Sequence, residues 1–183
     1  MATLTAPEQT PEQRQVVEGY AAVFDEVTTL FNIEDWEYRE VLQRGAFDGA
    51  DLSDVVLNFD HGRTGRIYAR TTNNTLTLNV DERGLHMSAD IIDTSDGQDV
   101  YKLVKRGDVN KMSYAFTIAK DNVSYDERQK VCTRTIEKID KVYDVSIVVN
   151  PAYDGTSVAA RDKEDVKELT KNLRERAILE TYL

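Results

Sequence analysis

The chain has 183 residues, with 23 Lys and Arg against 33 Asp and Glu, which gives a formal net charge of −10. Charged residues make up 31% and hydrophobic residues 40%, a balance typical of one globular domain and not of a disordered chain. The acidic balance argues against broad nucleic-acid binding, which needs clustered Lys and Arg facing phosphates.

Cysteine and histidine content restricts the chemistry further. A single cysteine, Cys132, excludes an internal disulfide framework and a multi-cysteine zinc site, and two histidines leave little material for a metal centre. No apolar run reaches about 18 residues, and the first residues lack the apolar core of a secretion signal. We therefore expect a cytoplasmic origin, no metal or cofactor and no membrane segment.

The first part of the chain is expected to form two strands after a loose tail. Residues 1–15 are polar and show no apolar period, so a flexible N-terminal tail is predicted there. Strands are predicted over 16–24 and 36–42, with a loop over 25–35 between them.

The segment 55–61 places a histidine at the end of an apolar row. Alternation with period two puts four residues on one face of a strand: Val55, Leu57, Phe59 and His61. Such a histidine is either a core-edge residue with a backbone partner or a base at the lip of a cleft.

Most of the remaining chain is expected to be β-structure. A hairpin is predicted over 67–80, with Asn73 and Asn74 at its turn. Further strands are predicted at four places: 85–91, 112–119, 130–139 and 141–149. The polar segment 120–129 is expected to be an exposed loop.

Two helices complete the prediction. Ser95 and Gln98 fit an N-terminal capping box, and apolar residues at helical spacing predict a helix over 96–106 that stops at Gly107. A second helix is predicted over 162–183, with an apolar stripe along one side.

Many short strands and few helices predict a mainly β fold with flanking helices, either a β-barrel or two packed antiparallel sheets. We expect one domain over residues 16–161, preceded by the tail and followed by the C-terminal helix.

Ser113 is a candidate nucleophile. Period-two alternation puts three small residues on one face of its strand: Ser113, Ala115 and Thr117. Small residues there allow either close packing of a neighbouring element or a floor on which a substrate backbone could lie.

Asp144 is unexpected inside the apolar strand 141–149. Burial of an unpaired carboxylate costs several kcal/mol, so the side chain should have a charged or hydrogen-bonding partner. An imidazole would serve, as would an arginine such as Arg66 or Arg134.

Together, His61, Ser113 and Asp144 supply the three groups of a serine-protease triad. Ser113 would attack a carbonyl carbon, His61 would take the hydroxyl proton, and Asp144 would orient the imidazole. Their order along the chain is no objection, because triads are defined by geometry, but spacing alone does not establish that the three meet.

A second set of the same residue types is rejected. His86, Ser88 and Asp90 alternate along one strand, about 6.6–7 Å apart, which exceeds hydrogen-bonding reach. We interpret them as a solvated row. Cys132 has no histidine near it in sequence and is expected to be an inert, half-buried thiol.

The segments taken in order resemble the prohead maturation proteases of tailed bacteriophages, a family similar in fold to the herpesvirus assemblin proteases. The resemblance covers most of residues 19–161. It is carried by an ordered set of short motifs: Gly19-Tyr20-Ala21-Ala22-Val23-Phe24, Gly45-Ala46-Phe47, Asn58-Phe59-Asp60-His61 with Gly65-Arg66, Asp81-Glu82-Arg83-Gly84-Leu85, Gly107, Met112-Ser113-Tyr114-Ala115-Phe116, Asp144-Val145-Ser146-Ile147-Val148 and Asn150-Pro151-Ala152-Tyr153.

The resemblance implies that His61 is the base and Ser113 the nucleophile. It matches Asp144 to the third position, with Glu137 and Asp140 as alternatives. Ala115 departs from the family pattern, which often has glycine two residues after the serine; a narrower substrate channel is one consequence. The loop 150–156 is our expectation for the oxyanion donors.

The implied task is limited proteolysis inside the phage procapsid, which is assembled in the host cytoplasm. The substrates would be a scaffold protein or the N-terminal extension of the major capsid protein, and then the enzyme itself. Residues 1–15 and 162–183 would be self-cleavage or packaging segments. The resemblance also implies self-association as a dimer, with no nucleic-acid or membrane partner.

Two other interpretations stay open at this stage. One is a catalytically inactive scaffolding or structural module of the capsid on the same fold. The other is an unrelated β-barrel binding domain in which the triad residues are scattered. Intact His61 and Ser113 favour the protease over both.

Overall fold

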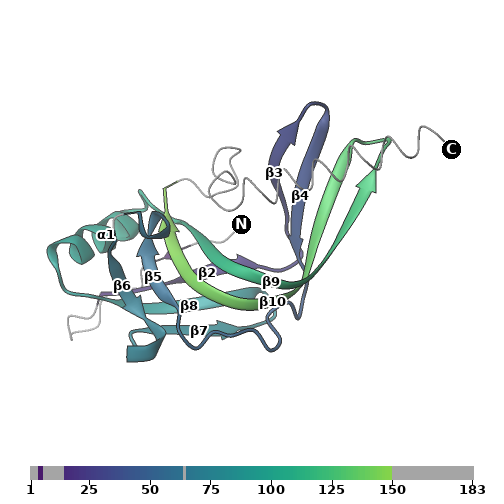
Figure 1. The fold of residues 1–183 in the computed structure, drawn as a ribbon. Helices are drawn as coiled ribbons and strands as arrows, with labels where there is room; N and C mark the ends of the chain where they lie inside the picture. The colour runs from purple at the N-terminus through teal and green to yellow at the C-terminus, as the bar shows by residue number, and fades with distance from the viewer. Residues whose placement is uncertain (1–3, 6–14, 64, 150–183) are drawn as a thin grey trace.

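The computed structural model describes residues 4–5, 15–63 and 65–149, which form two β-sheets and one α-helix (Figure 1). The first sheet has the order β1-β2-β8-β7 and is antiparallel throughout. Its strands are β1 (Leu4–Thr5), β2 (Gln15–Val23), β7 (Leu76–Val80) and β8 (Gly84–Ile91). Part of the segment expected as a tail therefore adds a short strand to this sheet.

The second sheet is built around one long strand, β10. Its order is β3-β4-β10-β5-β6, with β9 on the other edge of β10. The strands are β3 (Val27–Ile33), β4 (Trp36–Leu42), β5 (Val56–Phe59), β6 (Ile67–Arg70), β9 (Lys111–Asp126) and β10 (Val131–Val148). Two short 3₁₀ turns, η1 (Asp60–Gly62) and η2 (Thr71–Asn73), follow β5 and β6.

β10 takes different partners along one of its edges. β4 pairs with it in parallel over its first part, and β5 pairs with it in parallel over residues 144–147. Between them the loop 43–55 takes the place of a strand: the Ile139 N–H donates to the Ala46 carbonyl at 2.8 Å, and the Asp51 N–H donates to the Asp140 carbonyl at 2.8 Å. The edge of β10 is thus covered from its start to its end.

The middle of the β9–β10 pair is bent. Register shifts interrupt the pairing at four places between residues 136 and 144 of β10, and such bulges bend a strand and increase its twist. Figure 1 shows the two strands curving from the body of the molecule into an arm. The arm consists of β3, β4, residues 121–126 of β9 and residues 131–136 of β10. The bend separates the body, which carries the candidate site, from the arm.

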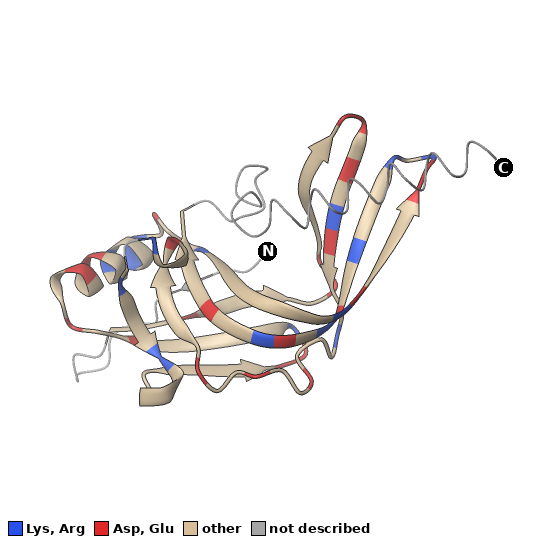
Figure 2. Cartoon of the chain, viewed as in Figure 1, with Lys and Arg blue, Asp and Glu red and all other residues tan. Residues whose placement is uncertain are grey.

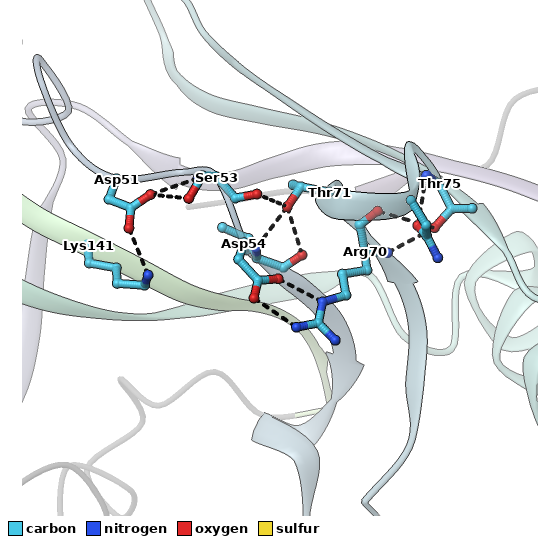
Figure 3. A network of polar contacts seen from close by, with 9 residues as sticks. Asp51, Ser53, Asp54, Arg70, Thr71, Thr75 and Lys141 are labelled. Carbon is cyan, nitrogen blue, oxygen red and sulfur yellow. Dashed lines mark hydrogen bonds and ion pairs between the residues drawn. The ribbon is translucent and has the colours of Figure 1, made fainter.

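A polar network fixes the loop that leads into β5 (Figure 3). The Asp51 carboxylate accepts from Lys141 Nζ at 2.7 Å and from the hydroxyl and N–H of Ser53. Asp54 forms a two-point ion pair with Arg70 on β6, at 2.7 and 2.8 Å. These contacts lower the pKa of both carboxyl groups, mainly through the bonds from Lys141 and Arg70. The network therefore ties the start of β5 to β6 and to β10.

The helix α1 (Ser95–Arg106) begins one residue earlier than expected. The Thr94 hydroxyl, and not that of Ser95, accepts the Gly97 N–H at 3.2 Å and caps the helix. Gly107 ends it with a left-handed backbone, φ 85°, as predicted. The helix buries Val100, Tyr101 and Val104. Among the described residues no helix has the length and apolar character needed to cross a membrane.

One apolar core joins the two sheets and the helix. Its fully buried members come from both sheets: Val17, Leu57, Leu85, Met87, Ile136, Val145 and Ile147. Each such side chain contributes about 1.5–3 kcal/mol relative to an exposed one. The core therefore stabilises the same elements that hold the candidate site.

The predicted mainly β class is confirmed, with two packed sheets; the described strands do not close into a barrel, and one sheet is mixed and not purely antiparallel. The predicted hairpin over 67–80 is wrong, because β6 and β7 belong to different sheets. The predicted loops over 25–35 and 120–129 contain β3 and the end of β9. The two strands predicted over 130–149 are one continuous strand.

These errors concern mostly the arm, where the hydrophobic signal is weak. Figure 2 shows acidic and basic residues interleaved on the arm strands. Ion pairs link Arg39 with Glu37 and Arg134 with Asp121. Beyond residue 119 of β9 only Val123 and Tyr125 alternate with polar residues, and this pattern is too short to mark a strand. Backbone pairing with β10 holds this part of β9 as a strand although its sequence pattern does not predict one.

Candidate active site

The register between β9 and β10 places two of the predicted residues on one face. Ser113 lies directly opposite Ser146, and Ala115 lies opposite Asp144. Paired residues point to the same side of a sheet, and residues two apart on a strand do so as well. Ser113, Asp144 and Ser146 therefore share a face in the body of the molecule.

His61 reaches this face from a neighbouring element. β5 runs parallel to β10, with Phe59 opposite Ile147, and ends there. The turn η1 then places His61 beyond the end of β5 with a left-handed backbone, φ 53° and ψ 40°. Asp60 and Gly62 on either side of it also have positive φ, 52° and 70°. The turn thus carries the imidazole over β10 toward β9.

The three side chains form one hydrogen-bonded chain. His61 Nδ1 lies 3.0 Å from Asp144 Oδ1, and His61 Nε2 lies 2.9 Å from Ser113 Oγ. With the imidazole proton on Nδ1, the ring donates to the carboxylate and accepts the serine hydroxyl. The imidazole can therefore withdraw the hydroxyl proton while the carboxylate balances the charge that forms.

Burial differs among the three groups. Ser113 is 2% exposed, the Asp144 side chain 14% and the His61 side chain 34%. Partial exclusion of water strengthens the attraction between the carboxylate and a protonated imidazole. The imidazole is the group most open to solvent.

The alternative acids lie elsewhere on β10. Glu137 forms an ion pair with Lys120, with a distance of 2.5 Å between Oε2 and Nζ. Asp140 accepts a hydrogen bond from the Thr117 hydroxyl at 3.3 Å. Of the three candidate acids, Asp144 is the one that contacts His61.

The second set of residues is not assembled. On β8, His86, Ser88 and Asp90 lie opposite Tyr20, Glu18 and Val16 of β2. The Ser88 hydroxyl donates to Glu18 at 3.0 Å, and the His86 ring packs edge-on against Tyr20. The side chains of Ser88 and His86 are thus engaged across the strand pair instead of along it.

Cys132 has the environment of an unreactive thiol. It is 3% exposed, on the part of β10 that belongs to the arm. Burial raises the pKa of this thiol and so disfavours the thiolate.

Ser146 is a site residue that the sequence analysis did not single out. Its side chain is fully buried, and its hydroxyl oxygen accepts the His61 backbone N–H at 2.8 Å. The available signal was its position two residues after Asp144, which puts both on one face of a strand. The loop 150–156 and the helix 162–183 lie outside the described residues, as does most of 1–15.

Among the described residues no cluster of three or more His, Cys, Asp or Glu side chains is arranged to hold a metal ion. The groups that the structure places in contact at this face are a hydroxyl, an imidazole and a carboxylate.

Comparison with known proteins identifies the family. The family described as caudovirus prohead serine protease matches residues 2–171 of the 183. Neither the curated proteins nor the solved structures contain a match. Since the family match spans nearly the whole chain, this chain belongs to the caudovirus prohead serine protease family.

Proposed function

We propose that this chain is the serine endopeptidase of phage head maturation in which Ser113 is the nucleophile, His61 the general base and Asp144 the residue that orients His61. The family supplies the serine peptidase activity and the place in head maturation. The observation that carries the residue assignment is the continuous hydrogen-bonded chain from Asp144 through His61 to Ser113.

The reaction begins at the Ser113 hydroxyl. Its oxygen forms a bond to the carbonyl carbon of the scissile peptide while His61 Nε2 takes the proton. The tetrahedral intermediate collapses when the protonated imidazole gives this proton to the departing amine, and the C–N bond breaks. Water then attacks the acyl-enzyme with the same base, which releases the acid and restores the hydroxyl.

Asp144 acts through the imidazole. Its Oδ1 accepts from Nδ1, which keeps Nε2 free to accept the serine proton. The carboxylate also stabilises the positive charge that the ring gains during each proton transfer. Asp144 is therefore a positioning residue that does not itself exchange a proton with the substrate.

The face that holds Ser113 suits an extended peptide. Ala115 and Thr117 follow it on the same face of β9, and all three are small. Ala115 stands where the resembling family often has glycine, so its methyl group would narrow the space above the strand. We expect the enzyme to prefer small side chains at the substrate position that lies over Ala115.

The substrates in this proposal are capsid components. They are a scaffold protein or the N-terminal extension of the major capsid protein, cleaved inside the procapsid in the host cytoplasm, and then the enzyme's own terminal segments. The enzyme is proposed to act as a dimer and without nucleic acid. Mass spectrometry of the purified protein over time tests self-cleavage: unchanged termini under conditions where a capsid precursor is cut would contradict it.

Coexpression with the capsid precursor tests the proposal as a whole. We expect the wild-type chain and Ser88→Ala to shorten the precursor and Ser113→Ala to leave it intact. Ser88 is the matched control, because it is also a strand serine with a polar partner but contacts neither His61 nor Asp144. An uncut precursor with the wild-type chain, together with a normal shell, would instead favour a structural module of the capsid.

A further inference from the structure

The turn that presents His61 has an unusual backbone. Three successive residues, Asp60, His61 and Gly62, have left-handed φ values of 52°, 53° and 70°. This conformation is disfavoured for residues that carry a Cβ atom, and such strain persists only where the surroundings hold it. The conformation of His61 therefore needs a specific restraint.

The bonds within the turn are local. The Arg63 N–H donates to the Asp60 carbonyl at 3.3 Å, and the Gly65 N–H donates to the Gly62 carbonyl at 2.7 Å. Such bonds close the turn on itself but do not fix its position relative to the sheet.

Ser146 supplies a long-range restraint. Its hydroxyl oxygen accepts the His61 N–H at 2.8 Å, across 85 residues of sequence. Ser146 is 0% exposed and is held between Ser113 on β9 and Asn58 on β5 by the pairing of the three strands. The hydroxyl is therefore carried by a strand that is paired on both edges at this position.

The same strand also holds the imidazole ring. Asp144 lies two residues before Ser146 on the same face and contacts His61 Nδ1. Residues of β10 thus contact His61 at two points, the backbone nitrogen and the ring. Together these two contacts set where Nε2 lies relative to Ser113. Loss of either contact would allow His61 to rotate about the other.

We propose that Ser146 is a positioning residue: its buried hydroxyl holds the left-handed backbone of His61 so that the imidazole stays between Asp144 and Ser113. This role rests on the proposed function of those three residues. It predicts an effect on the rate of reaction at Ser113 and little effect on the binding of a small reagent, because Ser146 is fully buried and its hydroxyl is bonded to the His61 backbone.

The first test is the rate of Ser113 labelling by a fluorophosphonate. We expect Ser146→Ala to lower the maximal labelling rate by at least about tenfold, since small misplacements of a catalytic group cost rate on that scale. The probe concentration for half-maximal rate should change by less than about twofold. Cys132→Ala is the matched control, because it also removes one buried side-chain heteroatom from β10, far from His61.

The second test observes His61 directly by nuclear magnetic resonance. In a His86→Gln background His61 is the only histidine, so its Nδ1–H resonance can be assigned without ambiguity. We expect a sheltered, low-field signal in the parent protein, its loss in Ser146→Ala and its retention in Cys132→Ala. A Nδ1–H signal that persists in Ser146→Ala would contradict the proposal even if labelling were slow.

A third test uses the strain itself. Asp60→Gly removes the Cβ of a left-handed residue and also the carboxylate that pairs with Arg63 at 3.6 Å, whereas Asp60→Asn removes the charge and keeps the Cβ. Asp60→Gly should therefore restore at least about threefold of the labelling rate lost in Ser146→Ala, and Asp60→Asn should not. In the wild-type background Asp60→Gly should alter the rate by less than about twofold. Failure to restore any rate would contradict a role that acts through the backbone of the turn.

Ser146→Cys keeps the test decisive if Ser146→Ala does not fold. The thiol fills the space of the hydroxyl but is a weak acceptor, so the folded variant should label slowly and lose the Nδ1–H signal. Wild-type labelling by Ser146→Ala or Ser146→Cys would overturn the proposal. Absence of labelling in the wild-type chain would instead overturn the proposed function, while the resonance test would still report whether Ser146 holds His61.

Discussion

The molecule contains the same three residue types at two places, and only one of them is assembled. His61, Ser113 and Asp144 come from η1, β9 and β10 and contact one another at 2.9 and 3.0 Å. The second set lies along β8 alone, where successive members are about 6.6–7 Å apart and pair with β2.

The difference shows what builds a site of this kind. Side chains on one face of a single strand cannot meet, because successive ones are held about 6.6–7 Å apart by the backbone. Residues from three elements converge when cross-strand register and a turn bring them to one face. The same substitution made in both sets therefore tests whether activity depends on the contacts among the three side chains and not on residue type alone.

The largest contrast is expected between the two serines. Ser113→Ala should reduce fluorophosphonate labelling and precursor cleavage by at least about 10³-fold, because it removes the nucleophile. Ser88→Ala should leave both within about twofold. Equal melting temperatures would show that the first loss is chemical. Strong labelling of Ser113→Ala would place the nucleophile elsewhere.

A similar contrast is expected between the two histidines. His61→Ala removes the base and should lower labelling by at least about 10³-fold, with the fold intact by circular dichroism. His86→Ala removes an edge-on contact with Tyr20 and should lower the melting temperature slightly while labelling continues. Normal labelling in His61→Ala would refute its role as base.

The three candidate acids give the next contrast. Asp144→Asn should lower cleavage by about 10²–10⁴-fold, because an amide cannot stabilise the charged imidazole or hold the productive tautomer. Glu137→Gln and Asp140→Asn remove contacts with Lys120 and Thr117 and should change the rate by less than about threefold. A severe loss in either of these two, with an active Asp144→Asn, would transfer the third role to that residue.

The smallest effect concerns the network that anchors the start of β5. The hydrogen bond from Arg70 lowers the pKa of the Asp54 carboxyl group in the folded state. The pair therefore contributes its full stability above the pKa of the unfolded state, about 4. This stability is lost as the pH falls through the lower pKa of the folded state. Asp54→Asn should therefore reduce the melting temperature at neutral pH, and its difference from the wild-type chain should shrink below about pH 4. Asp93→Asn, an exposed change near α1, is the control. A difference that grew in acid would contradict the pairing.

Sequence pattern predicted the parts of the fold where one side of an element is buried. The alternation at 55–59 and 112–118 identified β5 and the first half of β9, and capping and glycine signals identified α1 to within one residue. The predicted continuation of the β5 row to His61 is wrong, because the strand ends at Phe59 and His61 lies in the left-handed turn η1. The pattern failed where packing does not impose alternation, as in β3 and the end of β9. It also failed between β6 and β7, because a turn sequence does not show whether the two strands that it joins belong to one sheet or to two.

For the site, the sequence indicated residue types but neither distances nor the face that His61 reaches. Alternation placed Ser113 on the small-residue face of its strand, yet its proximity to Asp144 depends on a register that includes bulges between residues 136 and 144. The left-handed turn was not predicted, although Asp60 and Gly62 are residue types that tolerate it. Ser146 was missed because its one signal, a position two residues after Asp144 on the same face of the strand, does not identify its partner.

Peptide mass spectrometry after fluorophosphonate treatment locates the covalent adduct and so tests directly whether Ser113 is the nucleophile and His61 its base. We expect one adduct, on Ser113, in the wild-type chain and in His86→Ala, and none in His61→Ala. An adduct on Ser88 or any other residue, or labelling of Ser113 that persists without His61, would contradict this assignment.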